Sequence, residues 1–309
     1  MGMGEEFMAP LYFTVLMILS LIWGGSFYFV KVLLGVFEPW TIAFFRCLFG
    51  LVTIIVMMMI LKIQFKTGKF PLKSMIAVSL FNTAIPWTFI AYSEQQISSG
   101  LASILNATTP IWTILVGLIF FKASTTKQQW IGILVAFIGL ILLLNIDAAS
   151  MMEGNLQAFG TMMLAAISYA FSSQLSKHGL GELSVYHIAF GTLLGGMIGS
   201  GIMALSFEEV SVLPVADGEI LRSLIGIGVF GSGIANILFY YLIKHGKPET
   251  AEMVTYLIPA SALVWGAFLL DEHITVRLIA GLLFILTGIM VSESKLPLKK
   301  QETAEELQQ

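Results

Sequence analysis

The chain alternates between long apolar stretches and short clusters of charged or turn-forming residues. A helix that crosses the hydrocarbon core of a membrane needs about 20 mainly apolar residues. Ten stretches fit this requirement, with approximate limits at 10–34, 38–61, 74–92, 98–121, 128–146, 156–176, 185–206, 220–243, 249–270 and 274–292. The pattern therefore predicts an all-α, polytopic membrane protein with ten transmembrane helices, joined by connections too short for a second soluble domain.

Composition supports this prediction. Of the 309 residues, 57% are hydrophobic and 11% are charged, and the mean hydropathy is +0.89. Soluble domains have about 25% charged residues, so a soluble fold of this composition would expose large apolar patches. The net charge of −3 offers no basic surface for nucleic acid. Soluble enzymes, disordered chains and nucleic-acid binders are thereby excluded, and the expected partners are the lipid bilayer and a small-molecule substrate.

The few charges separate by side when the N-terminus is placed in the cytoplasm. Twelve of the sixteen basic residues then fall on cytoplasmic segments: Lys62, Lys66, Lys69, Lys73, Lys122, Lys127, Lys177, Lys244, Lys247, Lys295, Lys299 and Lys300. The outer segments collect mainly acidic residues: Glu38, Glu94, Asp147, Glu153, Glu208, Glu209, Asp217, Glu219, Asp271 and Glu272. By the positive-inside rule, we expect a multi-pass protein of the plasma or inner membrane with both termini cytoplasmic. Residues 293–309 are expected to form a cytoplasmic tail.

The two halves of the chain resemble each other. LIWGGSFYFVK (21–31) aligns with ISYAFSSQLSK (167–177) at a spacing of 146 residues, and SLFNTAIPWTFIAY (79–92) aligns with GVFGSGIANILFYY (228–241) at a spacing of 149. We therefore expect two five-span repeats, at 10–146 and 156–292. An odd number of spans gives the second repeat the opposite orientation, and inverted repeats are the basis of alternating access in many carriers. A duplicated scaffold without a pore is the alternative.

Several residues in order carry a resemblance to a known family. They are Trp23-Gly24-Gly25-Ser26, Lys31, Pro39, Arg46, Ala102, Pro110, Gly132, Gly139, Tyr240-Tyr241, Pro259, Asp271-Glu272, Gly281 and Gly288. With these the chain resembles the ten-helix EamA-type transporters of the drug/metabolite transporter superfamily. The resemblance implies a basket-like bundle with a central cavity, no cofactor, and export or import of amino acids or related metabolites. The chain departs from the pattern at Ala123, where the second half has Glu272, and at Arg46, whose counterpart is Thr192.

Arg46 is the charge that lies deepest in a predicted span, about eight residues or ~12 Å from its end. Charged residues within a membrane are costly and usually functional. Arg46 either lines the cavity and binds a substrate carboxylate, or donates hydrogen bonds that hold neighbouring helices together. Lys31 lies nearer the outer end of its span, where we expect it to snorkel.

Acidic residues within the spans bear on ion coupling. No Asp or Glu lies between Glu6 and Glu38, so the first span lacks the carboxylate with which the related four-helix multidrug exporters exchange protons. Glu252, one turn into the ninth span, is the candidate coupling group. Its alternative role is that of an acidic residue that suits the positive end of a helix.

Uncharged residues complete the candidate site. The further cavity candidates are Trp23, Asn82, Tyr92, Asn106, Tyr169, Asn236 and Tyr241, and the predicted kinks or hinges are Pro86, Pro110 and Pro259. Trp87 lies near a span end and fits an interfacial belt as well. Gly191, Gly195 and Gly199 form a small-residue face that packs within the bundle or against a second protomer, which leaves a homodimer open.

No enzyme motif and no cysteine–histidine cluster occur, and the four histidines are scattered, so neither catalysis nor a metal site is expected. The leading hypothesis is a secondary transporter for small metabolites, favouring export of amino acids or related compounds. The alternatives are a drug, sugar or nucleoside permease of the same fold and, less favoured, a membrane protein without transport function.

Overall fold

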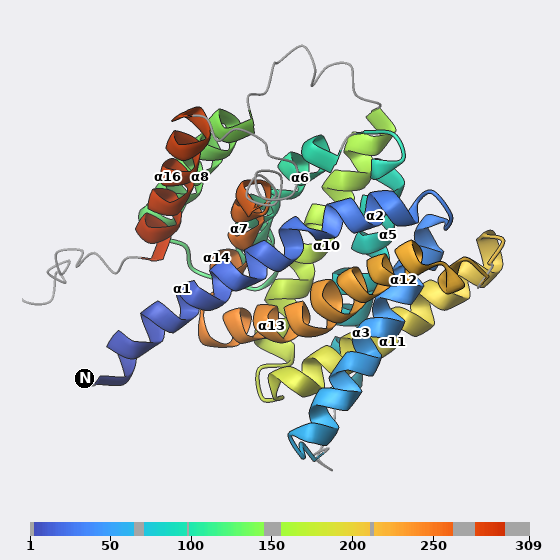
Figure 1. Cartoon of the computed structure of the whole chain (residues 1–309). Helices are drawn as coiled ribbons and strands as arrows, with labels where there is room; N and C mark the ends of the chain where they lie inside the picture. The colour runs from blue at the N-terminus through green and yellow to red at the C-terminus, as the bar shows by residue number, and fades with distance from the viewer. Residues whose placement is uncertain are drawn as a thin grey trace, which may run out of the picture.

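The computed structural model describes residues 3–64, 71–97, 99–144, 156–210, 213–261 and 276–293, and every regular element among them is a helix (Figure 1). The first half contains α1 (Met3–Gly24), α2 (Ser26–Leu33), α3 (Pro39–Ile60), α4 (Leu72–Ser79), η1 (Leu80–Ala84), α5 (Ile85–Glu94), α6 (Ser99–Asn106), α7 (Thr109–Phe120) and α8 (Lys127–Leu144). The second half contains α10 (Leu156–Gly179), α11 (Val185–Phe207), η2 (Leu213–Ala216), α12 (Gly218–Ile225), η3 (Gly226–Ile234), α13 (Ala235–His245), α14 (Pro248–Glu252) and α16 (Val276–Glu293).

Each of the ten predicted spans contains helical residues at its expected place. Five helical stretches among the described residues are long and apolar enough to cross a membrane: Leu11–Leu33, Pro39–Ile60, Leu72–Glu94, Val185–Phe207 and Gly218–His245. The prediction of an all-α, polytopic membrane protein is confirmed. Residues 294–309 of the predicted tail at 293–309, the end of the ninth span and the pair Asp271-Glu272 lie outside the described residues.

Two spans contain π-helical turns at matching positions of the two halves. In η1 the backbone N–H of Ile85 bonds to Leu80 O, and in η3 that of Ala235 bonds to Phe230 O, five residues back in each case. The extra residue in a π turn shifts the carbonyls and side chains that follow, and such turns are frequent at functional sites. The bundle therefore has an irregular backbone in the third and eighth spans.

Helix breaks accompany the predicted prolines. Pro86 lies in the first turn of α5, directly after η1, and Pro110 follows the interruption at 107–108 between α6 and α7. In the second half the helix is interrupted at Met253, and Pro259 lies in the helical stretch 254–261 that follows. The breaks of the fourth and ninth spans thus both precede a proline, and a hinge movement at these sites stays a prediction.

Small residues bring α3, α11 and the third span close together. A Cβ at Gly191 would meet the side chain of Met75, one at Gly195 would meet Ser79, and one at Gly196 would meet Thr83. The glycine face of α11 is therefore used within the bundle, against α4 and η1.

The helices α8 and α16 form a second close pair, seen side by side in Figure 1. A Cβ at Gly132 would lie 2.6 Å from the backbone oxygen of Gly288, and one at Gly139 would lie 2.8 Å from that of Gly281. These four glycines are the residues matched by the repeat, so the same contact is made twice along the pair.

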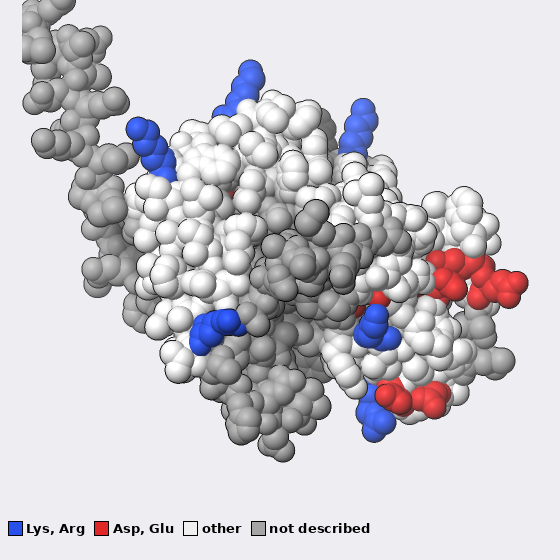
Figure 2. Space-filling view, turned by 90° about the horizontal axis from the view of Figure 1, so that it is seen from above, with Lys and Arg blue, Asp and Glu red and all other residues white. Residues whose placement is uncertain are grey.

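The outer surface agrees with a membrane environment. Ile131, Leu134 and Ile138 on α8 and Leu283 on α16 are each about half exposed. Charged side chains are sparse on the face shown in Figure 2, and the larger acidic groups lie toward one end of it.

Candidate functional site

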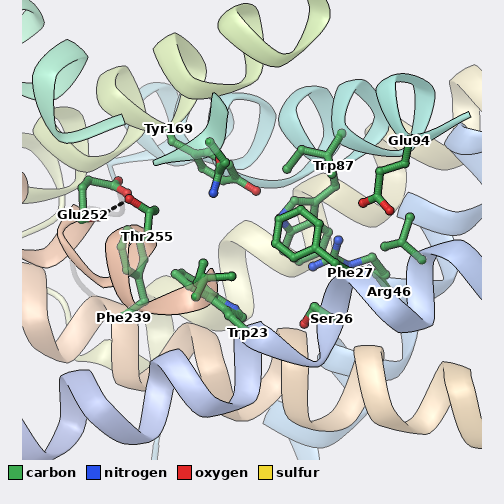
Figure 3. A pocket seen from close by; sticks show the side chains of 14 residues that line it. Trp23, Ser26, Phe27, Arg46, Trp87, Glu94, Tyr169, Phe239, Glu252 and Thr255 are labelled. Atoms are coloured by element: carbon green, nitrogen blue, oxygen red, sulfur yellow. Dashed lines mark hydrogen bonds between the residues drawn. The ribbon is translucent and has the colours of Figure 1, made fainter. Parts of the chain in front are cut away.

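A pocket lies among the helices of both halves. Its lining consists of Trp23, Ser26, Phe27, Val30, Arg46, Trp87, Ile90, Glu94, Asn106, Tyr169, Phe239, Glu252, Thr255 and Ile258. Five of the residues predicted from the sequence are brought together here: Trp23, Arg46, Asn106, Tyr169 and Glu252. The lining combines one guanidinium group, two carboxyl groups and several aromatic rings (Figure 3).

Arg46 projects from α3 and is 6% exposed. Its guanidinium carbon lies 4.0 Å from the centroid of the Trp87 ring, a cation–π contact. Its Nε donates to Ser232 Oγ at 3.4 Å, and that hydroxyl donates to Ile227 O at 2.8 Å within η3. Arg46 thus lines the pocket and also joins α3 to the π-helical segment, so both interpretations of this residue describe part of its surroundings.

Trp23 is fixed by the same π-helical segment. Its indole Nε1 donates to Gly231 O at 3.0 Å, and its ring lies 5.4 Å from that of Phe239. One face of the pocket is therefore an aromatic wall, fixed by a hydrogen bond from α1 to η3.

Glu252 is the last residue of α14 and is 2% exposed. Its carboxylate accepts a hydrogen bond from the Ser173 hydroxyl on α10. Its backbone oxygen accepts one from Thr255 Oγ1 at 2.8 Å (Figure 3). Tyr169 and Tyr240 are its neighbouring titratable side chains. Glu252 is a buried acid at one end of the pocket, with hydroxyl groups around it.

Glu94 is a pocket residue that the sequence interpretation missed. It was assigned to an outer segment as a marker of topology, but it ends α5 with no exposed surface. In Figure 3 its carboxylate is directed toward Arg46. The internal repeat could have indicated that Glu94 is buried, because the corresponding residue of the second half is the apolar Ile243.

Trp87 also differs from the expectation of an interfacial belt. It is 5% exposed and lies under the Arg46 guanidinium in the middle of the bundle. Trp87 lies one turn after η1. Sequence periodicity does not predict the π-helical turn of η1.

Asn106 and Tyr169 line the pocket between the charged groups. Asn106 ends α6 at the helix break and is 5% exposed, and its Oδ1 has no hydrogen-bond partner among the described residues. This oxygen is available to a donor group of a bound molecule.

The other four cavity candidates lie outside the lining. Asn82 and Asn236 are buried against each other, with Asn82 Nδ2 donating to Asn236 Oδ1 at 3.5 Å. Tyr92 is 37% exposed, and its hydroxyl accepts from Gln157 Nε2. The Tyr241 ring lies 4.2 Å from that of His245. In this conformation Asn82 and Asn236 join η1 to α13, Tyr92 is exposed, and Tyr241 is partly buried against the core.

Within the described ranges, no three histidine, cysteine or acidic side chains gather in a way that could hold a metal ion.

Comparison with known proteins places this site in context. The EamA-like transporter family matches the chain twice, at residues 11–145 and 157–293. An uncharacterized transporter of Bacillus subtilis, YoaV, is 24% identical over 273 residues, which cover 88% of this chain and 93% of that protein. An uncharacterized transporter of Archaeoglobus fulgidus is 25% identical over 270 residues, covering 87% and 94%. The uncharacterized inner membrane transporter YedA of Escherichia coli is 24% identical over 269 residues, covering 85% and 84%.

A solved crystal structure has the same fold. It superimposes with a TM-score of 0.73 at 15% sequence identity, covering 92% of this chain and 96% of that chain. At this identity the likeness concerns the fold alone.

Proposed function

Because this chain belongs to the EamA-like transporter family and is a membrane transporter, we propose that it is a secondary carrier for a small zwitterionic metabolite, an amino acid or a related compound. The substrate binds in the central pocket and crosses by alternating access, without ATP. Export across the plasma or inner membrane is the favoured direction, with both chain termini in the cytoplasm.

The observation that carries this proposal is the mixed charge of the pocket. Arg46 supplies a cation, and Glu94 and Glu252 supply carboxyl groups, in a pocket bounded by aromatic rings. A buried charge is costly unless a charged partner or hydrogen bonds compensate it. A zwitterion presents both a carboxylate and an ammonium group, so it can satisfy both kinds of group at once.

Arg46 is assigned to the substrate carboxylate. Its Nε donates to Ser232 and its guanidinium carbon lies over the Trp87 ring, and these two contacts fix the position of the guanidinium. The two terminal nitrogens then form the fork that binds a carboxylate with two parallel hydrogen bonds. Lysine could supply the charge but not this geometry.

Glu252 is assigned to the substrate ammonium group and to a proton in turn. A carboxyl group buried with only hydroxyl donors favours its neutral form, whereas a bound ammonium group favours the ionised form. Binding of substrate and binding of the proton would therefore exclude each other, which couples the two flows. In the alternative role, Glu252 only stabilises the helix break.

A cationic drug is the second candidate substrate, because Glu252 and the aromatic wall alone would bind an apolar cation. Such a substrate needs no carboxylate and makes no use of Arg46. The two candidates therefore differ in their dependence on this residue.

The test is counterflow in proteoliposomes, with a panel of amino acids, their amides and apolar cations, run with and without a pH gradient. We expect Arg46→Gln to lower amino-acid exchange by about 100-fold, since about two charge-assisted hydrogen bonds are lost. Arg277→Gln, an exposed arginine of α16, is the matched control. Full amino-acid exchange by Arg46→Gln would refute the carboxylate assignment, and unchanged transport of apolar cations alone would favour the drug permease.

A further inference from the structure

Two lysines at equivalent positions of the repeats each bind the end of a helix. Lys31 Nζ donates to Glu94 O at 2.7 Å, at the end of α5. Lys177 Nζ donates to the oxygens of Ile243, Lys244 and Gly246 at 3.0, 2.9 and 2.8 Å, at the end of α13. Lys177 follows Lys31 by 146 residues and Ile243 follows Glu94 by 149, the two spacings of the repeat. We call these contacts the Lys31 cap and the Lys177 cap.

Each cap meets a physical need of the helix end. The last four carbonyl groups of a helix have no partner within it, and a cation there also opposes the negative end of the helix dipole. Near a membrane core, unsatisfied carbonyls cost several kcal/mol each. Because the repeats are inverted, the two caps lie at opposite faces: the Lys31 cap at the predicted outer face and the Lys177 cap at the predicted cytoplasmic face.

The two caps are unequal. The Lys31 cap has one hydrogen bond and the Lys177 cap has three. At the Lys177 end a further bond joins Lys244 Nζ to Leu183 O at 2.8 Å, linking α13 to the segment after α10. The structure is therefore held together more firmly at the Lys177 end.

The pocket is unequal in the same sense. Its centre is lined by residues that the repeat relates in pairs: Trp23 with Tyr169, Ile90 with Phe239, and Asn106 with Thr255. Beyond this centre four lining residues come from the Lys31 end, Ser26, Phe27, Val30 and Glu94, whereas Glu252 alone comes from the Lys177 end, where it accepts from Ser173. More of the pocket lining thus lies toward the Lys31 cap than toward the Lys177 cap.

The counterparts of these residues at the Lys177 end are a set of serines. Ser172, Ser173 and Ser176 correspond to Ser26, Phe27 and Val30, and all three are at most 2% exposed. The hydroxyl groups of Ser172 and Ser176 have no hydrogen-bond partner among the described residues. Such buried hydroxyls are unfavourable, and they would be satisfied if water reached them.

We propose that Lys31 and Lys177 are the paired gate residues of the transport cycle, and that the Lys177 cap keeps the pocket closed toward its own end in this conformation. In the opposite conformation Lys31 donates to the carbonyls of Glu94, Gln95 and Ile97, while Lys177 keeps only its bond to Ile243. The three serines then line the pocket. This inference rests on the proposed alternating access, but it concerns conformation and needs no knowledge of the substrate.

The test measures which end of the pocket is open by cysteine labelling. Cys47 is the only cysteine, so Cys47→Ala gives a clean background. Val30→Cys reports on the Lys31 end and its counterpart Ser176→Cys on the Lys177 end. The labelling rate of each with a water-soluble maleimide is measured in the full-length, reconstituted protein.

Lys177→Met removes three bonds from this conformation but one from the opposite conformation. We expect the labelling rate of Ser176→Cys to rise about tenfold and that of Val30→Cys to fall, which corresponds to a shift of ~1.4 kcal/mol. Lys31→Met should shift both rates in the opposite direction, and Lys177→Arg should restore the original rates. Lys73→Met, an exposed lysine of α4 at the same predicted face, is the matched control and should change neither rate.

Unchanged rates in Lys177→Met would overturn the gate assignment. So would a parallel rise of both rates, because general loosening of the bundle produces that result. Correct shifts in labelling combined with no amino-acid counterflow would refute the proposed substrate and leave the gate assignment standing.

Discussion

In the first repeat the second span carries Arg46, which binds Ser232 of the other repeat at 3.4 Å. In the second repeat the corresponding span carries Thr192, and its backbone oxygen accepts from Thr83 Oγ1, also at 3.4 Å. Thr83 and Ser232 are themselves matched by the repeat. The same crossing of helices is therefore made twice, once with a charge and once without.

The other matched positions divide in the same way. Among those with the same residue in both halves, the lysine caps and the glycines of α8 and α16 hold the backbone. Those that differ place ionisable groups in the pocket: Glu94 against Ile243, and Glu252 against Ser103. A small substrate has different groups at its two ends, so a symmetric pocket could not satisfy both. We infer that the lysine caps and matched glycines support the conformational change, and that the matched positions which differ support substrate binding.

The largest expected effect comes from the matched glycines. In Gly288→Leu the new Cβ would collide with backbone atoms of Ala136 and Gly132, which cannot move aside as a side chain can. The helices must separate, at a cost of about 3 kcal/mol in the free energy of unfolding. Gly139→Leu, its counterpart, should cause the same loss. Unfolding in mixed detergent micelles measures both.

Gly160→Leu is the control for these variants, since nothing lies within 4 Å of its Cβ position. Similar stability of Gly288→Leu and Gly160→Leu would contradict the close packing of α8 and α16. A decrease in the free energy of unfolding in only one of Gly288→Leu and Gly139→Leu would show that the two glycine contacts between α8 and α16 are not equivalent.

The next effect concerns Glu252, which has no acidic counterpart. One proton exchanged per substrate allows about tenfold accumulation per pH unit. Glu252→Gln cannot release a proton and lacks the charge that pairs with the substrate ammonium group. We therefore expect exchange of substrate for substrate to persist only at higher substrate concentration, while accumulation driven by the pH gradient is lost. Glu249→Gln is the control, because Glu249 is also buried but accepts from Gln129 outside the pocket. Gradient-driven accumulation by Glu252→Gln would refute the coupling role.

A smaller effect is expected at Glu94, whose carboxylate is directed toward Arg46. Replacing it with glutamine removes a negative charge near the site of the substrate carboxylate. We expect Glu94→Gln to bind a 2-oxo acid about fivefold more tightly, by ~1 kcal/mol, and to gain less for the corresponding amino acid. Binding is measured by competition, with Glu38→Gln, an exposed residue before α3, as control. Equal gains for both ligands would refute a charge effect.

The sequence predicted local features of the structure better than features that depend on tertiary contacts. Apolar runs predicted the spans because hydropathy is a local property, and the repeat register predicted which glycines are equivalent. It also singled out Arg46 and Glu252, which lie where a charge is costly. Each of these features can be predicted from one segment of the sequence or from a comparison of two segments.

The remaining features depend on segments far apart in the chain. Glu94 lies two residues beyond the predicted span, and only the approach of α2 and α3 to the end of α5 makes it part of the pocket. Asn82 and Asn236 were predicted for the cavity like Asn106, but 154 residues separate them and they contact each other. Buried amides that pair and amides that face a pocket have the same sequence pattern, so only tertiary packing distinguishes them.

The smallest effect is expected at a difference between the repeats outside the pocket. Asp217 caps α12, accepting from the backbone N–H of Glu219 at 2.8 Å and of Ile220 at 3.2 Å, whereas Pro71 at the equivalent start of α4 makes no side-chain cap. These bonds lower the pKa of the Asp217 carboxyl group. Its stabilisation is therefore present above the ordinary pKa of about 3.9 and is lost as the pH falls through the lowered value. We expect Asp217→Ala to lower the unfolding temperature by about 1 °C at neutral pH, and by less at pH 3, as measured by thermal unfolding in detergent. An equal decrease at both pH values would show that the ionised carboxylate is not what stabilises the start of α12.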